Sequence, residues 1–499
     1  MSEHQLSQRD RTPPPASAGT RPVHRWRAFA VLAVSYFMTI VDLAIVNVAL
    51  PTIGRELHMG ESSLQWVVTG YGLTFGGFLL LGGRAADLLG RRRILLIGLL
   101  VFTAASLGCG LSTSDSALIP MRALQGLGAA IVLPAALSIV MNMFPEGAER
   151  NKALGVWGAI GASGATVGVI AGGVLTRYVG WQSIFFLNVP IGVVAALLAP
   201  RLVPESRLST QRRRYDPFGA ITVTGGLSLL VYTISTAPQY GWGGARTVSL
   251  LAASAVLLAA FAVTEMRVEA PLMPLRIFRS RTLTGANAVS VLLGGSFFAF
   301  IFVGTLYMQQ VLGYSALRAG LSWLAASLSS VAFAGLSQAL VTRGSAKLVM
   351  ASGMAMIGGG ILWATQVPVH GHFWQDLAGP FLITGIGTAF AFIPVSIAAL
   401  AGIADHEAGL ASGLLNTSQQ LGGAIGVAIT STIAATHFSD LVHHGTLPVA
   451  ALTSGFSWAF WACGAIGLAA VPVTFLLVRR TELAAVVANA TGKPLPEPA

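Results

Sequence analysis

The sequence predicts an all-α membrane protein that crosses the bilayer fourteen times. Of its 499 residues, 54% are hydrophobic and only 10% are charged, whereas soluble domains contain about 25% charged residues. Apolar runs of about 20 residues, long enough to cross a hydrocarbon core of roughly 30 Å as helices, recur along the chain. Non-helical backbone facing lipid would leave its amides unbonded. The predicted spans are 27–50, 63–83, 93–112, 117–143, 151–176, 181–203, 217–236, 247–266, 283–311, 316–341, 346–366, 374–402, 407–436 and 453–478.

The Lys and Arg residues orient these spans. A net charge of +11 would suggest nucleic acid in a soluble protein. Here the basic residues lie in short loops, and most of them lie on the side that carries both termini, which is a topology signal. We therefore expect a multi-pass protein of the cell (inner) membrane with both termini in the cytoplasm and no nucleic-acid partner. The outer loops contain only Arg55, Arg177, Arg246 and Arg318.

The chain contains an internal repeat at an offset near 258 residues. Three glycines of the fifth span recur with the same spacing in the thirteenth, and a Gly-X-Gly motif recurs in spans four and twelve. Two parallel halves of this kind are typical of transporters with a site between them near mid-membrane. Recurring glycines also mark close packing in any membrane helix, and that alternative stays open. The matches pair Gly155, Gly164 and Gly168 with Gly413, Gly422 and Gly426, and Gly126 and Gly128 with Gly385 and Gly387.

The repeat leaves the seventh and eighth spans unmatched, so we interpret them as an inserted pair between two six-helix bundles. The resulting domain prediction is a cytoplasmic tail at 1–26, a first bundle at 27–203, a loop and inserted pair at 204–281, a second bundle at 282–478 and a cytoplasmic tail at 479–499.

The loop after the second span has an ordered set of glycine, acidic and basic residues. Gly83 is followed by Asp87, Gly90, Arg91 and Arg92. Gly90 permits a tight turn, and a carboxylate at the helix end can pair with arginine or cap a neighbouring helix. The alternative is ordinary anchoring by basic residues at the membrane surface.

Two charged residues lie inside predicted spans, where charge is costly and is by default functional. Asp42 lies about 22 Å of helix rise from Arg27, and Arg122 lies about 8 Å from the outer end of its span, so both have similar depths. Burial favours a neutral carboxyl group, and a nearby arginine favours the ionised one. The alternatives are a structural, hydrogen-bonded aspartate and an arginine that snorkels to the outer face.

The fifth span is rich in glycine and includes Gly155, Gly164, Gly168, Gly172 and Gly173. Such a helix can bend and can pack closely on its neighbours.

Together, these motifs resemble those of the fourteen-helix drug:proton antiporter (multidrug efflux) family of the major facilitator superfamily over roughly residues 27–480. The resemblance implies the major facilitator fold and export of small molecules against protons by alternating access. It links Asp42 and Arg122 to proton coupling and the glycine-rich fifth span to antiport. It makes the Asp87 loop a latch of the outward-facing state against the start of the thirteenth helix. Val169 stands where the family has proline after Gly168, which weakens the expected kink.

The second half lacks charged counterparts of these residues and offers apolar, aromatic and amide side chains instead. Tyr307, Gln309, Asn416 and Gln419 are therefore the predicted substrate contacts. The expected partners are a small-molecule substrate, protons and membrane lipid, and the expected state is a monomer. Because both cysteines lie in apolar runs without ligand spacing, we expect no metal, cofactor or disulfide framework.

Two other functions fit the same scaffold: translocation of a lipid or cell-envelope precursor, and a membrane sensor that transports nothing. Retained Asp42 and Arg122 argue against the sensor. An enzyme is disfavoured because the chain lacks the His-Glu-x-x-His, Gly-x-Ser-x-Gly and phosphate-binding Gly-Lys-Ser/Thr motifs.

Overall fold

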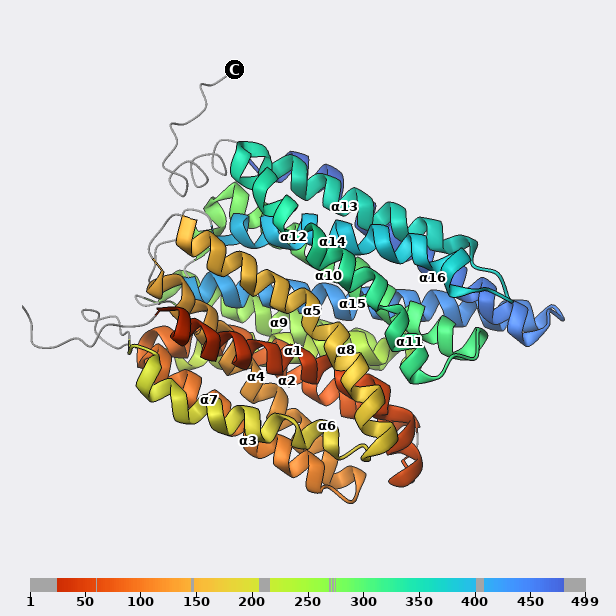
Figure 1. Cartoon of the computed structure of the whole chain (residues 1–499), viewed down its shortest axis with the longest axis horizontal. Coiled ribbons are helices and arrows are strands. Elements are labelled where there is room, and N and C mark those ends of the chain that lie inside the picture. Colours follow the sequence, from red (N-terminus) through yellow and green to blue (C-terminus); the bar gives the residue numbers. More distant parts are fainter. Residues whose placement is uncertain are drawn as a thin grey trace, which may run out of the picture.

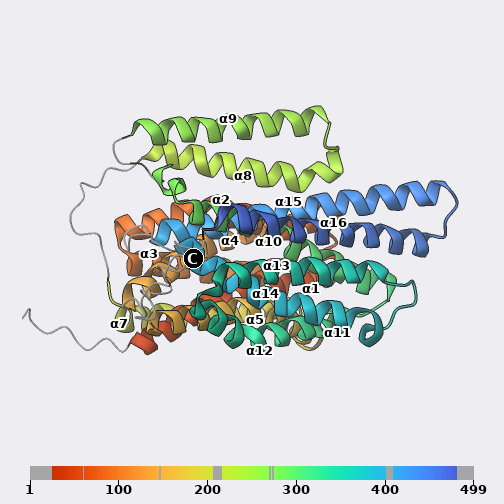
Figure 2. The ribbon, with the colours of Figure 1, turned by 90° about the horizontal axis from the view of Figure 1, so that it is seen from above.

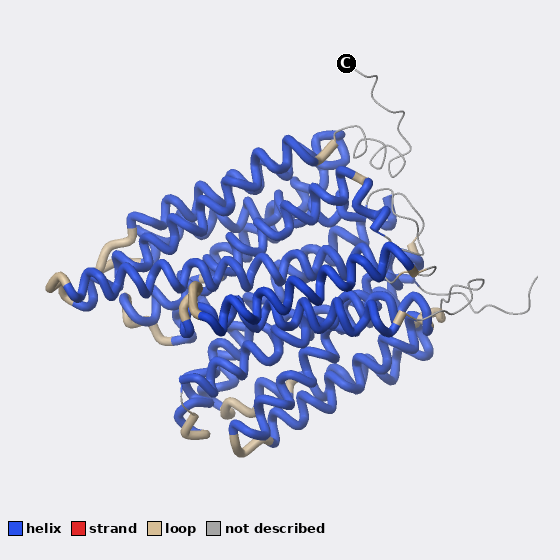
Figure 3. The backbone as a smooth tube through the Cα atoms, turned by 180° about the vertical axis from the view of Figure 1, so that it is seen from behind, coloured by secondary structure: helices blue, strands red, loops and turns tan. Residues whose placement is uncertain are grey.

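The structure is a computed structural model, which describes residues 25–59, 61–144, 148–205, 216–268, 271, 273, 275–400 and 408–479. Within these residues the regular structure is helical and contains no strand, and the helices run side by side along the long axis (Figure 1 and Figure 3). Most of both predicted tails lies outside the described residues. We call the end of the bundle where α1 begins and α16 ends the terminal side.

The first half of the chain forms six rods. The sixth rod is interrupted at Leu187, between α6 and α7, because Pro190 has no N–H to donate to the carbonyl group one turn earlier. The elements are α1 (Arg25–Glu56), α2 (Glu61–Leu89), α3 (Arg91–Leu111), α4 (Asp115–Met143), α5 (Ala148–Tyr178), α6 (Ser183–Phe186) and α7 (Asn188–Leu202).

A helical hairpin follows, made of α8 (Pro217–Tyr240) and α9 (Ala245–Arg267) and continued by the short η1 (Leu275–Arg279). The carboxylate of Asp216 caps α8 by accepting the N–H of Gly219 at 2.8 Å. Pro217 occupies the first helical position, where its missing N–H is not needed.

The second half forms six more rods, several of which are lengthened or bent by short irregular turns. They are α10 (Arg281–Leu306) with η2 (Tyr307–Val311), α11 (Ala316–Ser322) with α12 (Leu324–Leu340) and η3 (Val341–Ser345), α13 (Ala346–Trp363) with η4 (Ala364–Gln366), η5 (Phe373–Leu377) with α14 (Ala378–Leu400), α15 (Ala408–His443), and α16 (Pro448–Leu477).

The described helices therefore group into fourteen rods at the predicted positions, and the predicted all-α membrane fold is confirmed. Twelve of the rods are long and apolar enough to cross a membrane. The other two, α5 and α8, contain the shorter apolar stretches Val167–Tyr178 and Phe218–Ile234. With 31 residues, α5 has a length of roughly 46 Å, which exceeds the hydrocarbon thickness.

The two halves pack their helices in the same pattern. In the first half α1 packs on α5 and α7, and α4 packs on α2 and α3; in the second, α10 packs on α15 and α16, and α14 packs on α12 and α13. The contact of α3 with α7 likewise has its counterpart in the contact of α13 with α16. The sequence repeat thus corresponds to equivalent helix crossings.

The repeated Gly-X-Gly motif has the same packing role in both halves. The first glycine, Gly126 or Gly385, packs on the backbone of the second rod of its half, α2 or α12. The second glycine, Gly128 or Gly387, packs on the backbone of the third rod, α3 or α13. At each position an added Cβ would overlap a backbone atom of the neighbouring helix, so only glycine permits the approach.

Two seams join the halves. At one seam α2 packs on α15, and α8 packs on both of these helices, so we call it the covered seam. At the other, α5 packs on α11 and α12, and no helix in the described part of the chain packs across it in the same way; we call it the open seam. Figure 2 shows α8 and α9 as a separate layer on one side, with α5, α11 and α12 on the opposite side.

Adding one methyl group at a glycine crossing should weaken the fold. In Gly422→Ala the Cβ would overlap the carbonyl oxygen of Val291 on α10, which should cost about 1–3 kcal/mol and lower the thermal unfolding midpoint in detergent. The control is Gly335→Ala, which meets nothing within 4 Å and should be neutral or more stable by up to about 1 kcal/mol. Equal midpoints for the two variants would contradict this account of the crossing.

Candidate functional site

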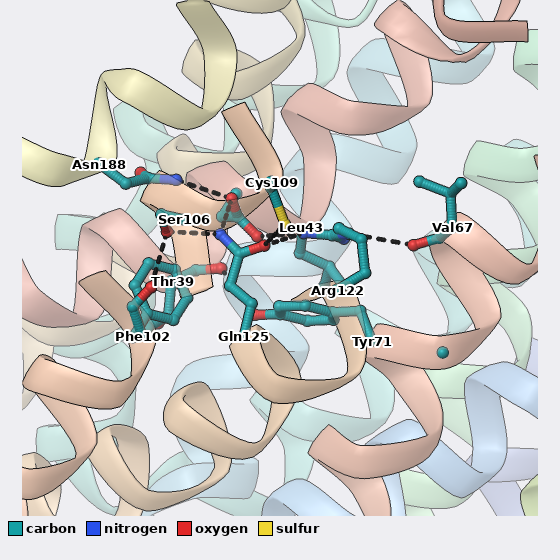
Figure 4. A network of polar contacts seen from close by, with 12 residues as sticks. Thr39, Leu43, Val67, Tyr71, Phe102, Ser106, Cys109, Arg122, Gln125 and Asn188 are labelled. Carbon is teal, nitrogen blue, oxygen red and sulfur yellow. Dashed lines mark hydrogen bonds and ion pairs between the residues drawn. The ribbon is translucent and has the colours of Figure 1, made fainter. Parts of the chain in front are cut away.

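An ion pair between Asp42 of α1 and Arg122 of α4 lies inside the first half (Figure 4). Nη1 of Arg122 donates to Oδ2 of Asp42 at 2.8 Å. The Arg122 side chain is 1% exposed and the Asp42 side chain is 0% exposed. The arginine therefore does not snorkel to the bilayer edge. In a low-dielectric interior each charge needs the other, because a single unpaired charge there is strongly unfavourable.

Two amide side chains complete the shell around the carboxylate. Nε2 of Gln125 and Nδ2 of Asn188 each donate to Oδ1 of Asp42 at 2.7 Å. Gln125 also donates to Oγ of Ser106 at 2.7 Å, while its Oε1 accepts from Arg122 at 2.6 Å. The side chains come from α1, α3, α4 and α7, so this hydrogen-bond network joins four helices (Figure 4). Charge-assisted hydrogen bonds of this kind are the strong ones.

The guanidinium group of Arg122 is held independently of Asp42. Its Nε donates to the carbonyl oxygen of Val67 on α2 at 3.0 Å. Its Cζ atom lies 4.4 Å from the ring centre of Tyr71 and 5.7 Å from that of Phe185, distances at which an aromatic face attracts a cation. Loss of the carboxylate charge would therefore leave the arginine with other partners.

The predicted site residues do not include Gln125, Asn188 or Ser106. Asn188 is distant in sequence from Asp42, and it reaches the carboxylate because α7 begins at this residue. The sequence signal that could have found it is an amide inside an apolar run, two residues before Pro190, since polar side chains in membrane spans seek polar partners.

The Asp87 loop has the geometry of a tight, buried turn. Gly90 has a φ of 107°, a backbone conformation that favours glycine. Oδ1 of Asp87 accepts from Nε and Nη2 of Arg91 at 3.0 and 2.9 Å and from Ser138 of α4 at 3.3 Å. Its Oδ2 has no hydrogen-bond partner among the described residues. The predicted partner of this loop is the start of α15, which follows residues 401–407, and these lie outside the described residues.

The remaining residues of the loop tie α2 and α3 to other helices. Gly83 is buried. Helix α2 approaches α4 closely at the adjacent Gly82, where an added Cβ would overlap the carbonyl oxygen of Ala130. The backbone N–H of Arg92 donates to Glu205 at 3.2 Å, and its Nη1 donates to carbonyl groups at the end of α7. These contacts hold the terminal-side ends of the first bundle together.

The predicted glycines of α5 face three different helices. Gly164, Gly168 and Gly172 face α1, and a Cβ at Gly168 would lie 2.7 Å from the carbonyl oxygen of Val41, the residue before Asp42. The helix that touches the open seam thus packs directly on the backbone beside the buried carboxylate. Gly173 faces Leu317 of α11, and Gly155 faces Gln338 of α12.

Val169, which replaces the expected proline, has a packing role at the open seam. A Cβ on Gly320 of α11 would overlap the Val169 side chain. The branched side chain of Val169 therefore occupies the space next to Gly320, where α5 and α11 pack together.

The four predicted substrate contacts have different surroundings. Tyr307 is enclosed in the core of the second half, and its hydroxyl group donates to the carbonyl oxygen of Pro368 at 2.7 Å; in this conformation it is not placed to touch a substrate. Gln309, Asn416 and Gln419 are half-buried. The amide of Asn416 donates to the carbonyl oxygen of Ser412 in its own helix at 2.9 Å. Among the described residues, no group of three or more metal-binding side chains is present.

A double-mutant cycle should show that the buried charges depend on each other. Arg122→Leu leaves Asp42 without its guanidinium partner, which should cost about 3–5 kcal/mol and lower the thermal unfolding midpoint in detergent near neutral pH. Adding Asp42→Asn removes the unpaired charge and should recover much of that loss. Simple addition of the two single-variant effects would mean that the pair is not coupled.

Comparison with known proteins assigns the family. The sequence pattern of the Major Facilitator Superfamily matches residues 32–427. The puromycin resistance protein pur8 of Streptomyces alboniger is 37% identical over 479 residues, which cover 94% of this chain and 95% of that protein. The cephamycin export protein CmcT of Amycolatopsis lactamdurans is 37% identical over 410 residues, 81% of this chain and 84% of that protein.

Two further comparisons agree. The tetracenomycin C resistance and export protein of Streptomyces glaucescens is 32% identical over 83% of this chain and 77% of its own length. The crystal structure of the human organic anion transporter MFSD10 (TETRAN) shares the fold with a TM-score of 0.63 at 15% identity, covering 91% of this chain and 100% of that one. The chain therefore belongs to the major facilitator superfamily and is a multi-pass membrane transporter of small molecules.

Proposed function

We propose that this transporter exports drug-like or amphiphilic small molecules in exchange for protons, as a monomer in the cytoplasmic membrane with its terminal side in the cytoplasm. The observation that carries the proposal is the enclosed carboxylate of Asp42, held by one guanidinium group and two amides. Relatives named for puromycin resistance, cephamycin export and tetracenomycin export support outward transport of antibiotic-like molecules.

The proton step follows from the hydrogen-bond network. Ionised Asp42 accepts from Arg122, Gln125 and Asn188 and so fixes α1 against α4 and α7. A proton on the carboxyl group removes the negative charge and occupies one acceptor position, so the donors lose part of their interaction. The guanidinium group keeps its contacts with Val67 and Tyr71. Protonation thus releases α1 from its neighbours without leaving the arginine unpartnered.

A movement of α1 can be transmitted through α5 to the interface between the two halves, where substrate would bind. Gly168 packs on the backbone next to Asp42, and Gly173 and Gly155 of the same helix face α11 and α12 across the open seam. A substrate between the halves and a proton on Asp42 would then shift one two-state equilibrium in opposite directions, which is the requirement for antiport. Ionised Asp42 favours the loaded, inward-open form, and protonation from the outside favours release and return.

The Asp87 loop is the proposed latch of the outward-facing state. Its carboxylate lies at the terminal side, already joined to Arg91 and to Ser138 of α4. One oxygen atom, Oδ2, faces no hydrogen-bond donor among the described residues, which leaves it available to the start of α15. An added partner there would close the terminal side when the opposite side opens.

Asp42→Asn should abolish proton-driven export while the protein still inserts. An amide of nearly the same shape keeps the packing but cannot exchange a proton at neutral pH. The assay uses inside-out vesicles with an imposed pH gradient and follows uptake of puromycin and of a fluorescent bisbenzimide dye. Asp440→Asn is the matched control, because that aspartate is 68% exposed and lies away from the ion pair. Substrate-induced proton movement retained in Asp42→Asn vesicles would overturn the proposal.

A further inference from the structure

The inserted hairpin makes the two seams of the transporter unlike each other. Away from the terminal side, Trp66 of α2 stacks on Tyr232 of α8 with ring centres 5.6 Å apart. Nε1 of Trp242, in the turn after α8, donates to Oγ1 of Thr432 of α15 at 2.9 Å. The hairpin is therefore fastened to both halves at this end of the covered seam.

The hairpin stays close to the covered seam along its length. Near mid-membrane Gly77 of α2 faces Ser228 of α8 so closely that a Cβ would overlap the serine hydroxyl group. Gly76 lies opposite both Gln420 of α15 and Val231 of α8, each at 4.0 Å from its would-be Cβ. Three helices meet at this point, so the gap between α2 and α15 is closed on its lipid side.

The terminal-side end of the covered seam is closed as well. A cavity of only about 10 Å³ lies there, lined by Leu80, Leu81, Val223, Phe261, Met273 and Leu410. All six side chains are apolar. Beside it Arg84 of α2 donates to the carbonyl oxygen of Pro271, in the segment that follows α9. A molecule in the bilayer would have to displace the hairpin to pass between α2 and α15.

The open seam has no such cover in the described part of the chain. Its outer portion is tightly packed, because Gly173 contacts Leu317 and Gly320 contacts Val169. Its portion nearer the terminal side is looser than the outer portion and has ordinary van der Waals distances: a Cβ on Gly155 would be 4.0 Å from Gln338, and one on Gly158 would be 3.7 Å from Ile393 of α14. Here, unlike at Gly76, no described helix covers the lipid side.

Gln338 is a polar side chain in this looser part of an otherwise apolar surface. Its Oε1 atom is buried and has no hydrogen-bond partner among the described residues. Its neighbours on the same helix, Phe333 and Leu336, are 37% and 48% exposed, as expected of side chains that face lipid. Gly155 lies about two turns, roughly 10 Å, from the start of α5 at Ala148, and Gln338 lies about two turns before the end of η3, which continues α12 to Ser345. Unpaired polar groups at such depth are unfavourable unless a partner arrives.

We propose that the open seam between Gly155 and Gln338 is the lateral access site for substrate from the cytoplasmic leaflet, and that α8 and α9 restrict such access to this one side. The ligand class is an amphiphile whose apolar body stays among the lipid chains while a hydrogen-bonding group, such as an amine or amide N–H, meets the Gln338 amide. This inference rests on the proposed export function and specifies the path by which substrate reaches the interface between the halves.

The transport test compares two glutamines at the two seams. The bisbenzimide dye is the probe because it partitions into lipid and carries N–H donors. Gln338→Leu should raise the apparent KM for the dye by about five- to tenfold, the effect of one lost hydrogen bond, with little change in kcat. Gln420→Leu, at the covered seam, should leave both values unchanged. Equal effects of the two substitutions, or an unchanged KM in Gln338→Leu, would overturn the proposal.

A cysteine-labelling test measures the lipid accessibility of the two seams without relying on transport. A maleimide carried on a lipid acyl chain should label Gln338→Cys in vesicles, and the dye should slow that labelling. Ser228→Cys, on the side of α8 that packs on α2, should stay unlabelled, and the native Cys109 and Cys463 are buried. Rapid labelling of Ser228→Cys, or none of Gln338→Cys, would contradict the assignment of the seams.

The two experiments separate this inference from the export function. If an imposed proton gradient does not drive dye transport by the wild-type protein, the proposed export function is wrong, and the labelling test still decides which seam is open. If the wild type exports the dye and Gln338→Leu matches it, the export function stands and the access site is wrong.

Discussion

The structure depends on one pair of opposite charges enclosed among apolar helices. The Asp42 carboxylate and the Arg122 guanidinium have almost no contact with solvent or lipid, so the positive charge of Arg122 stabilises the ionised form of the Asp42 carboxyl group. Their hydrogen bonds reach α7 and the backbone of α2 directly, and they reach Ser106 of α3 through Gln125. The arrangement of the first half is therefore tied to the charge state of a single carboxyl group, whereas hydrophobic packing alone would be indifferent to protons.

The second half has the same helix arrangement but has aromatic residues at the positions that correspond to the ion pair. At the repeat offset of 258 Phe300 corresponds to Asp42, and at the offset of 259 that relates Gly126 to Gly385, Phe381 corresponds to Arg122. The two phenylalanine rings touch, with centres 5.3 Å apart, and Trp323 packs on both. Equivalent helix crossings are thus held by charge in one half and by aromatic packing in the other. In the proposed mechanism, this difference places the proton-responsive group in the first half.

Much of this could be predicted from the sequence, because the strongest signals are local. Long apolar runs set the helices, and a charge within such a run is conspicuous, so Asp42 and Arg122 were readily found. Asn188 was missed because its role depends on where α7 begins and on a contact between distant parts of the chain. Tyr307 shows a limit of the same kind: an aromatic residue in the sequence does not indicate whether its side chain faces a substrate path or, as in this conformation, the core. The cover over one seam depends on how α8 packs on both halves, which no local pattern encodes.

The central claim is that a proton and a substrate compete through Asp42. Infrared difference spectroscopy of the purified protein at mildly acidic pH tests it most directly, because a protonated carboxyl group has its own C=O stretching band. The account predicts that adding a transported substrate removes that band, and that Asp42→Asn lacks the change. A band unaltered by substrate, or an identical change in the Asn variant, would contradict it.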